Sequence, residues 1–96
     1  MERLDADACG TRMKGLQGDW VLDAAAGTLT RSFAFKGFAK PVQLANLVAW
    51  HAEKIGHHPD ICLGWGYVRV TWTTHDAGGL TGADFAAAEG LDRLLA

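Results

Sequence analysis

The sequence predicts an α+β domain in which a four-stranded antiparallel sheet has helices packed on one face. Two patterns predict this fold class. Two stretches of alternating apolar and polar residues are each divided by a turn, which is typical of β-hairpins. Apolar residues at helical spacing follow each stretch, and a weaker helical segment precedes the first, so the order is (α)-β-β-α-β-β-α. With 96 residues and no linker or repeat, the chain is expected to be a single domain over residues 1–96.

The first helix and the first hairpin are predicted at the start of the chain. Residues 5–16 form a weak helix, because two glycines lower its helix propensity. Residues 20–22 and 28–38 form two strands joined by a turn. In the second strand Phe33 and Phe35 share one face, since neighbouring side chains of a strand point to opposite faces. We expect both rings to reach the core.

A long helix follows, and Pro41 suits its first turn because that position needs no amide donor. The apolar stripe of this helix has helical spacing and consists of Leu44, Leu47, Val48, His51, Ala52 and Ile55. Gly56 ends the helix, and Pro59 cannot continue it. His57 and His58 are therefore expected in a loop just after the helix.

The second hairpin and the last helix complete the chain. Strands are predicted over residues 61–65 and 67–75, with glycines at the reversal between them. The alternation places His75 with the polar residues, opposite the valines. Residues 81–84 read Thr-Gly-Ala-Asp, which has the form of a capping box. An apolar stripe then extends a helix to Leu95.

The composition argues against several classes of function. A formal net charge of −2, with 21% charged residues, gives no basic surface for nucleic acid or for an anionic membrane. Cys9 and Cys62 belong to no metal-binding or redox motif, so a reducing, cytoplasmic location is expected. The first residues lack the apolar segment of a signal peptide, and no apolar run is long enough to span a bilayer.

Three of the four histidines fall in one group with two carboxylates. His57 and His58 adjoin, and Glu53, His75 and Asp84 lie at defined spacings from them. Histidine has an unperturbed pKa of about 6.5, so the group suits general acid/base catalysis without a metal. A zinc site made by the three histidines is the alternative. It is disfavoured because the H-E-x-x-H pattern is absent and adjacent histidines seldom bind one ion.

The motif Glu53-x3-His57-His58-Pro59-x5-Trp65-x9-His75-x8-Asp84 resembles that of the pterin-4a-carbinolamine dehydratases. Further stretches that look like family positions are Gly18-Asp19-Trp20, Phe33-x-Phe35-Lys36-Gly37-Phe38, Ala52-Glu53-Lys54, Thr73-Thr74-His75 and Gly79-Leu80-Thr81. The resemblance covers residues 16–95 and implies the same α+β fold, with association as a homodimer or homotetramer. The chain departs from the family pattern in its glycine-interrupted first segment, at Gly56 and at Trp65.

The resemblance also implies a reaction. The family's substrate is a 4a-hydroxytetrahydropterin, which an aromatic amino acid hydroxylase leaves behind, and its dehydration yields quinonoid dihydropterin for tetrahydropterin recycling. A proton must reach the departing hydroxyl while a base takes the proton from ring nitrogen N5. The implied partners are the pterin and a functionally linked hydroxylase, with no nucleic acid and no membrane. No metal or redox cofactor is implied, because the substrate already carries its leaving group.

Matching positions imply a role for each candidate residue. His57 and His75 are the implied acid/base pair, with the donor left open. His58 is expected to hold the substrate and to support charge at the reacting edge. Asp84 and Glu53 are each candidates to orient an imidazole.

Several of these residues also have a structural interpretation. Trp20 is a candidate wall of the substrate pocket, but a core aromatic is the simpler reading. Asp84 would stabilise the start of the last helix through its backbone amides. Glu53 is by default a solvated residue on a helix face. His51, on the apolar stripe, is expected to be packed and hydrogen-bonded rather than catalytic.

The rival class of function is a protein-interaction or assembly module of the same fold, either coactivator-like or an assembly chaperone. The family resemblance implies that relatives specialised for assembly tend to lose the histidines, whereas His57, His58 and His75 are all present here. Trp50, on the polar side of the long helix, is a candidate interface residue. Catalysis is therefore the leading hypothesis.

Overall fold

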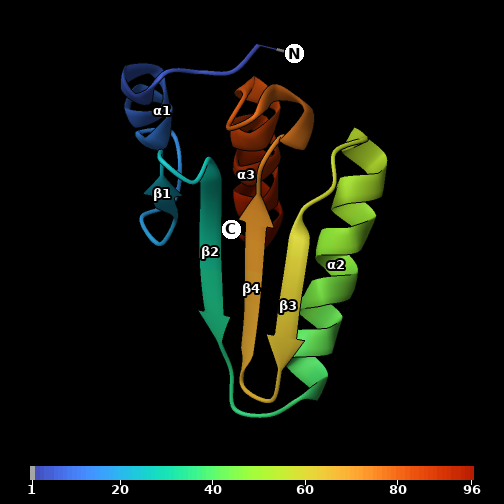
Figure 1. Cartoon of the computed structure of the whole chain (residues 1–96). Helices are drawn as coiled ribbons and strands as arrows, with labels where there is room; N and C mark the ends of the chain where they lie inside the picture. Colours follow the sequence, from blue (N-terminus) through green and yellow to red (C-terminus); the bar gives the residue numbers. More distant parts are fainter. Residues whose placement is uncertain (1) are drawn as a thin grey trace.

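A computed structural model gives the arrangement of the chain and describes residues 2–96. The elements are α1 (Ala6–Met13), β1 (Val21–Asp23), β2 (Thr28–Ala34), α2 (Ala39–Ile55), β3 (Asp60–Gly64), β4 (Tyr67–Trp72), the 3₁₀ helix η1 (His75–Ala77) and α3 (Gly82–Leu95). The strands form one antiparallel sheet in the order β1-β2-β4-β3 (Figure 1). The predicted fold class and element order are confirmed, with η1 as an addition. Within the described residues, no helix combines the length and the apolar character that crossing a bilayer requires.

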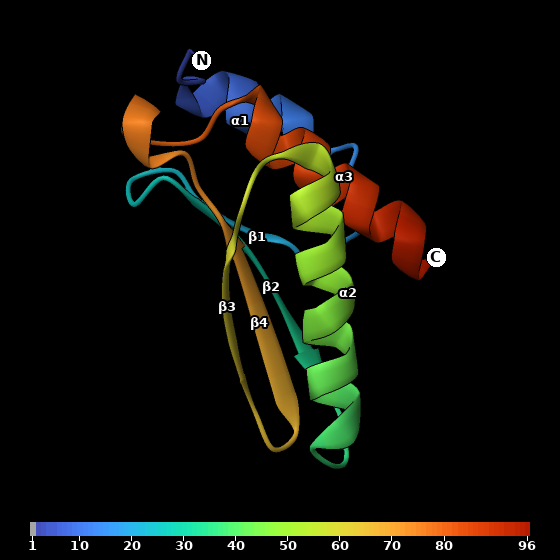
Figure 2. The same cartoon turned by 90° about the vertical axis from the view of Figure 1, so that its right-hand side faces the viewer.

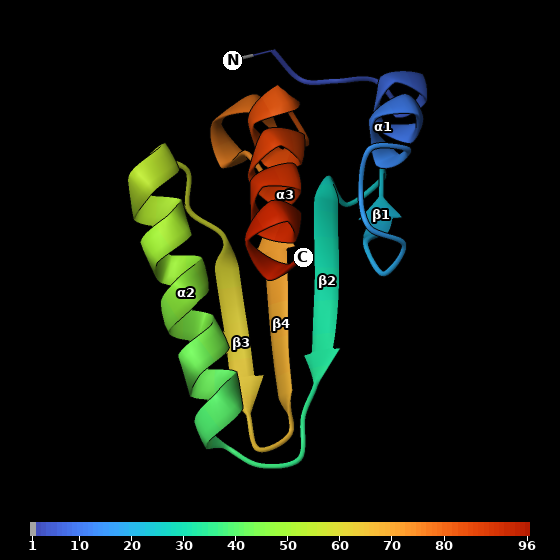
Figure 3. The same ribbon diagram turned by 180° about the vertical axis from the view of Figure 1, so that it is seen from behind.

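The helices α2 and α3 lie on the same side of the sheet, which Figure 2 shows nearly edge-on. From behind, α3 overlies β4 and α2 runs along β3 (Figure 3). The sheet face beneath them is apolar, and its residues pair across strands, such as Leu29 with Trp72 and Phe33 with Val68. Phe33 and Phe35 are partly buried and pack against this core, as expected.

Local sequence determines where the helices begin and end. Asp5 caps α1, because its carboxylate accepts a hydrogen bond from the backbone N–H of Ala8 at 2.8 Å. Gly56 ends α2 in the left-handed conformation, with φ of 70°. Thr81 and Asp84 form the predicted capping box at the start of α3.

The strand β4 ends earlier than predicted. It spans Tyr67–Trp72 rather than residues 67–75. The backbone of Thr74 pairs instead with that of Gly79, through N–H to oxygen contacts of 3.3 and 3.4 Å. This pairing closes a tight loop that contains η1, so the prediction that His75 belongs to a strand is wrong.

The strand β2 also ends early, at Ala34 instead of residue 38. The N–H of Phe35 donates to the carbonyl of Gly66 at 2.9 Å, and the N–H of Gly66 donates to the carbonyl of Gly37 at 2.7 Å. These bonds join the β2–α2 loop to the β3–β4 turn. The two connections therefore form one end of the molecule.

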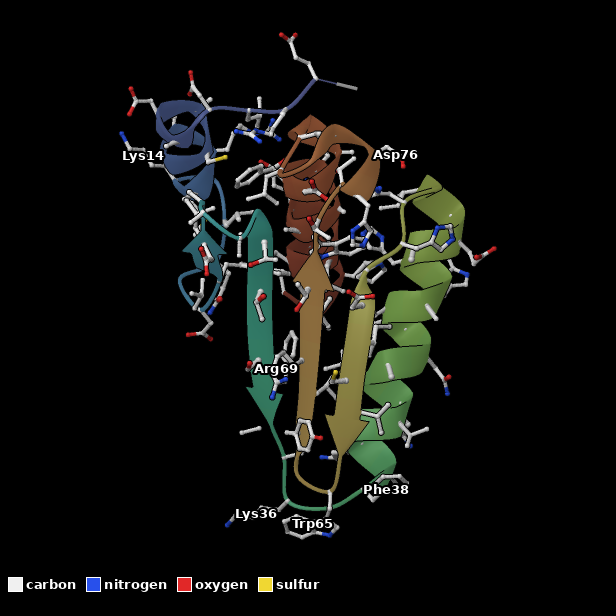
Figure 4. The ribbon with its side chains drawn as sticks, in the orientation of Figure 1. Lys14, Lys36, Phe38, Trp65, Arg69 and Asp76 are labelled. Carbon is white, nitrogen blue, oxygen red and sulfur yellow. The ribbon has the colours of Figure 1, made fainter. Side chains whose placement is uncertain are left out.

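This end carries basic and aromatic side chains. We term it the basic pole and define it by Lys36, Phe38, Lys40 and Trp65. Figure 4 shows Lys36, Phe38 and Trp65 together there, with Asp76 at the opposite end. Residues 24–52 and 61–75, which include the basic pole, contain no Asp or Glu. Trp65 is 71% exposed, so the basic pole presents a large aromatic surface to solvent.

Both cysteines are free thiols in different surroundings. Cys9 is buried against the core. Burial, followed by the negative charges of Asp5 and Asp84, raises the pKa of the Cys9 thiol. Cys62 is exposed on β3. The thiolate is the reactive form of cysteine. The thiol of Cys9 is less accessible than that of Cys62, and its raised pKa makes it harder to ionise than an ordinary thiol.

Gly27 occupies a position where the backbone excludes a side chain. Its φ is 71°, and a Cβ atom there would lie 2.8 Å from the Cα of Gly79. We expect Gly27→Ala to lower the free energy of unfolding by about 1–3 kcal/mol, because the left-handed conformation strains alanine and the contact would push two loops apart. Urea denaturation measures the change. Gly10→Ala is the control, since a Cβ on Gly10 in α1 meets nothing within 4 Å. Equal effects of the two substitutions would contradict the prediction.

Candidate active site

One fully buried carboxylate, that of Asp84, joins the loop after α2 to the loop after β4. Its Oδ1 lies 2.5 Å from Nε2 of His57. Its Oδ2 accepts from the hydroxyl of Thr74 at 2.7 Å and from the backbone N–H of Thr81 at 2.9 Å. The start of a helix also favours negative charge. Asp84 therefore holds both His57 and the residue directly before His75.

Two contacts hold the ring of His57. Because a carboxylate can only accept, its Nε2 carries the hydrogen that is donated to Asp84, and Nδ1 of the neutral ring keeps a lone pair. The ring also stacks on the indole of Trp72, with centroids 5.7 Å apart and planes 13° from parallel. The side chain of His57 is 21% exposed. Nδ1 is therefore the nitrogen that remains for chemistry.

His58 pairs with Glu53 at the surface. Nε2 of His58 lies 2.8 Å from Oε1 of Glu53. Both side chains are largely exposed, so solvent screens the pair and it adds little to stability. Glu53 thus contacts an imidazole while remaining on a solvated helix face. The contact also leaves Nδ1 of His58 unoccupied.

The imidazole of His75 is exposed at the start of η1 and forms no hydrogen bond with another side chain or backbone group of residues 2–96, whereas the backbone carbonyl of His75 accepts from the N–H of Gly78 at 3.0 Å. Its place is set through the preceding residue, Thr74, whose hydroxyl contacts Asp84. Five hollows of about 290–510 Å³ open on the described surface, and none of the five is lined by His57, His58 or His75. In the described part of the chain, no three His, Cys, Asp or Glu side chains are placed to hold a metal ion.

Trp20 lies away from the histidines. Its indole Nε1 donates to Oδ1 of Asp92 at 2.8 Å, and Arg31 contacts the same oxygen at 2.8 Å. Asp92 follows Asp84 by eight residues on α3, or about 12 Å along the helix axis. Trp20 is buried as a core aromatic, and its contacts give no support to a role as a pocket wall. His51 is also buried and contacts the carbonyl of Ala87 at 2.9 Å, as expected for a packed histidine.

Sequence reasoning missed two residues that contact the histidine group. In the sequence motif Thr74 stands only as the neighbour of His75, and Trp72 has no place in the motif. Trp72 is fully buried, yet it also forms the surface on which His57 stacks. The feature of the sequence that could have indicated Thr74 is its hydroxyl group, which directly precedes a candidate histidine. Spacing could not reveal its contact with Asp84, because the two residues meet through the closed loop between them.

Comparison with known proteins gives the relationship of the whole chain. The family model described as pterin 4 alpha carbinolamine dehydratase matches residues 2–94. The chain belongs to this family. The family resemblance seen in the histidine motif is therefore confirmed over nearly the full length.

Relatives in sequence and in structure agree with this assignment. A protein of Paracoccus denitrificans (strain Pd 1222), named "Putative pterin-4-alpha-carbinolamine dehydratase", is 45% identical over 93% of this chain and 82% of its own length. A protein of Rhodospirillum rubrum with the same name is 38% identical over 98% of this chain and 97% of its own length. The crystal structure of a transcriptional coactivator/pterin dehydratase from Brucella melitensis has a TM-score of 0.86 at 28% identity, covering 99% of this chain and 100% of that one.

A second structural relative has a different described role. It is a pterin dehydratase-like protein identified as a RuBisCO assembly factor in the alpha-carboxysome. Its TM-score is 0.66 at 28% identity, over 81% of this chain and 90% of that chain. The same fold therefore occurs in proteins with different described functions.

Asp84→Asn tests the contact between Asp84 and His57. Oδ2 of Asp84 faces a backbone N–H, which can only donate, so the amide oxygen should stay there and the amide NH₂ should face His57. We expect the neutral His57 ring to change from the Nε2–H to the Nδ1–H tautomer. We also expect the free energy of unfolding to fall by about 1–3 kcal/mol, because the donors lose a charged acceptor.

Long-range ¹H–¹⁵N correlation spectra of the histidine rings report the tautomer, and urea denaturation reports the stability. Glu53→Gln is the matched control, since it makes the same chemical change at the exposed His58 contact. It should leave both the His57 signals and the stability nearly unchanged. An unaltered His57 tautomer in Asp84→Asn would show that the buried contact does not set the ring.

Proposed function

We propose that the protein dehydrates a 4a-hydroxytetrahydropterin to quinonoid dihydropterin by histidine acid/base catalysis. Membership of the family supports this reaction. The observation that carries the proposal is the contact of His57 with buried Asp84. When the neutral ring donates from Nε2 to Asp84, Nδ1 of this partly exposed side chain keeps its lone pair, as a general base requires.

His57 is the base in this proposal. Nε2 keeps its hydrogen bond to Asp84, and Nδ1 takes the proton from N5 of the pterin. As that proton leaves, the N5 electron pair forms the double bond to C4a, and the C4a–oxygen bond breaks. The imidazolium that forms on His57 is stabilised by the adjacent carboxylate, in the way that an aspartate supports the histidine of a catalytic triad.

His75 is the acid that protonates the departing hydroxyl, which leaves as water. Its imidazole is exposed and forms no hydrogen bond with another described residue, so both ring nitrogens are accessible. His58 holds the pterin through Nδ1, since its Nε2 contacts Glu53. The reaction requires no external electron donor or acceptor, because the leaving group and the expelling nitrogen belong to the same molecule. Proton return from His57 to His75 through solvent completes the cycle.

The proposed setting is tetrahydropterin recycling in the cytoplasm, downstream of an aromatic amino acid hydroxylase. The proposed assembly is a homodimer or homotetramer. The exposed Trp50, which lies beneath the ammonium group of Lys54 at 4.8 Å from its ring centroid, is a candidate contact in that assembly. Assembly or coactivator activity alone ranks second, because it would give no role to the three histidines His57, His58 and His75, all of which are present.

Steady-state rate measurements with chemically generated 4a-hydroxytetrahydropterin test the reaction. The protein should accelerate loss of the 4a-hydroxy species, and His57→Ala and His75→Ala should each lower kcat by about a hundredfold to ten-thousandfold. His58→Ala should act mainly on KM, since His58 is assigned to binding.

Thermal unfolding checks that each variant folds: His58→Ala and His75→Ala should match the wild type because these side chains are exposed, whereas His57→Ala should fold with lowered stability because buried Asp84 loses one of its donors. The same assay coupled to a tetrahydropterin-dependent phenylalanine hydroxylase measures the recycling step. Unchanged rates in both His57→Ala and His75→Ala would rule out the proposed acid/base pair.

A further inference from the structure

One hydrogen bond cannot hold an imidazole ring in a single plane. The bond from Nε2 of His57 to Asp84 sets the position of that nitrogen. The ring can still pivot about the bond, and a pivot would swing Nδ1 away from any fixed target. A base that acts through Nδ1 therefore needs a second contact that resists this rotation.

We propose that Trp72 is the positioning residue that sets the plane of the His57 ring. The indole lies nearly parallel to the imidazole, with planes 13° apart and centroids at 5.7 Å. A flat surface against one face opposes the pivot that the hydrogen bond permits. This inference rests on the proposed function of His57 as base, and it adds a residue that contacts neither substrate nor the transferred proton.

The indole itself is held from several directions. Trp72 is fully buried at the end of β4, where it pairs with Leu29 of β2. His51 packs against it at 90°, with ring centroids 6.2 Å apart. A side chain enclosed on the sheet and by α2 has little freedom to tilt, so its plane is a stable reference for His57.

Core packing alone does not explain an indole at this position. Nε1 of Trp72 is buried and has no hydrogen-bond partner among the described residues. Burying an unpaired donor is unfavourable, and an aromatic ring without a polar atom would avoid that cost. What the indole provides is a wide flat surface next to His57, and this is the property that the proposal uses.

Substitutions at Trp72 separate the flat surface from the apolar volume. Trp72→Phe keeps a planar aromatic ring, whereas Trp72→Leu keeps an apolar side chain without a ring. We expect Trp72→Leu to lower kcat by about tenfold to a hundredfold with KM changed less than about twofold, since misplacing a catalytic group costs rate and not binding. Trp72→Phe should retain kcat to within about threefold.

Proton NMR of the histidine rings gives a readout that does not depend on activity. In the wild type, the stacked indole should displace the carbon-bound proton signals of His57 by its ring current. Trp72→Leu should abolish this displacement while ¹⁵N signals still report the Nε2–H tautomer. Trp72→Phe should keep part of the displacement.

Leu91→Ala is the matched control for lost core stability, because Leu91 is fully buried on α3 in the same hydrophobic core and has no aromatic ring. A fall in kcat of equal size in Leu91→Ala and Trp72→Leu would overturn the proposal. So would unchanged His57 signals in Trp72→Leu. Absence of dehydratase activity in the wild type would instead refute the proposed function, and the NMR comparison would still decide whether Trp72 sets the ring.

Discussion

The arrangement of the histidine group depends on one buried carboxylate that receives hydrogen bonds from three segments. Asp84 accepts from the loop after α2, from the residue before η1 and from the N-cap residue of its own helix. A buried charge is costly unless it is well hydrogen-bonded, so these donors must stay in place for the carboxylate to remain buried. The same contacts that cap α3 therefore hold His57 beside the loop that carries His75.

Much of the fold was predictable because it follows from local patterns. Strand alternation predicted the two hairpins, and the Thr81–Asp84 capping box predicted the start of α3. Element ends were less accurate. Alternation beyond Trp72 looked like more strand, but the Thr74–Gly79 pairing turned the chain into a loop instead. Such pairing depends on which backbone groups meet in space. The alternation of apolar and polar residues along the sequence does not show which groups these are.

The candidate site was predictable in its residue types and not in its contacts. The motif placed Asp84 in the group, but only the structure joins it to Nε2 of His57. Trp20 matched a family position, yet its indole contacts Asp92 further along α3. The fold by itself does not decide function either, since a relative of similar architecture is described as an assembly factor. The chemistry resides in the particular hydrogen bonds that this chain makes.

The separation of charge along the molecule has a consequence for how two copies approach each other. The basic pole lies at one end of a body about 38 Å long, in segments of the chain that contain no Asp or Glu, and Asp76 lies at the opposite end. Each copy therefore has an electric dipole along its long axis. Side-by-side neighbours attract when they point in opposite directions and repel when they point the same way. Salt screens this interaction beyond roughly 10 Å at 0.1 M ionic strength. Low ionic strength therefore favours antiparallel encounters between two copies.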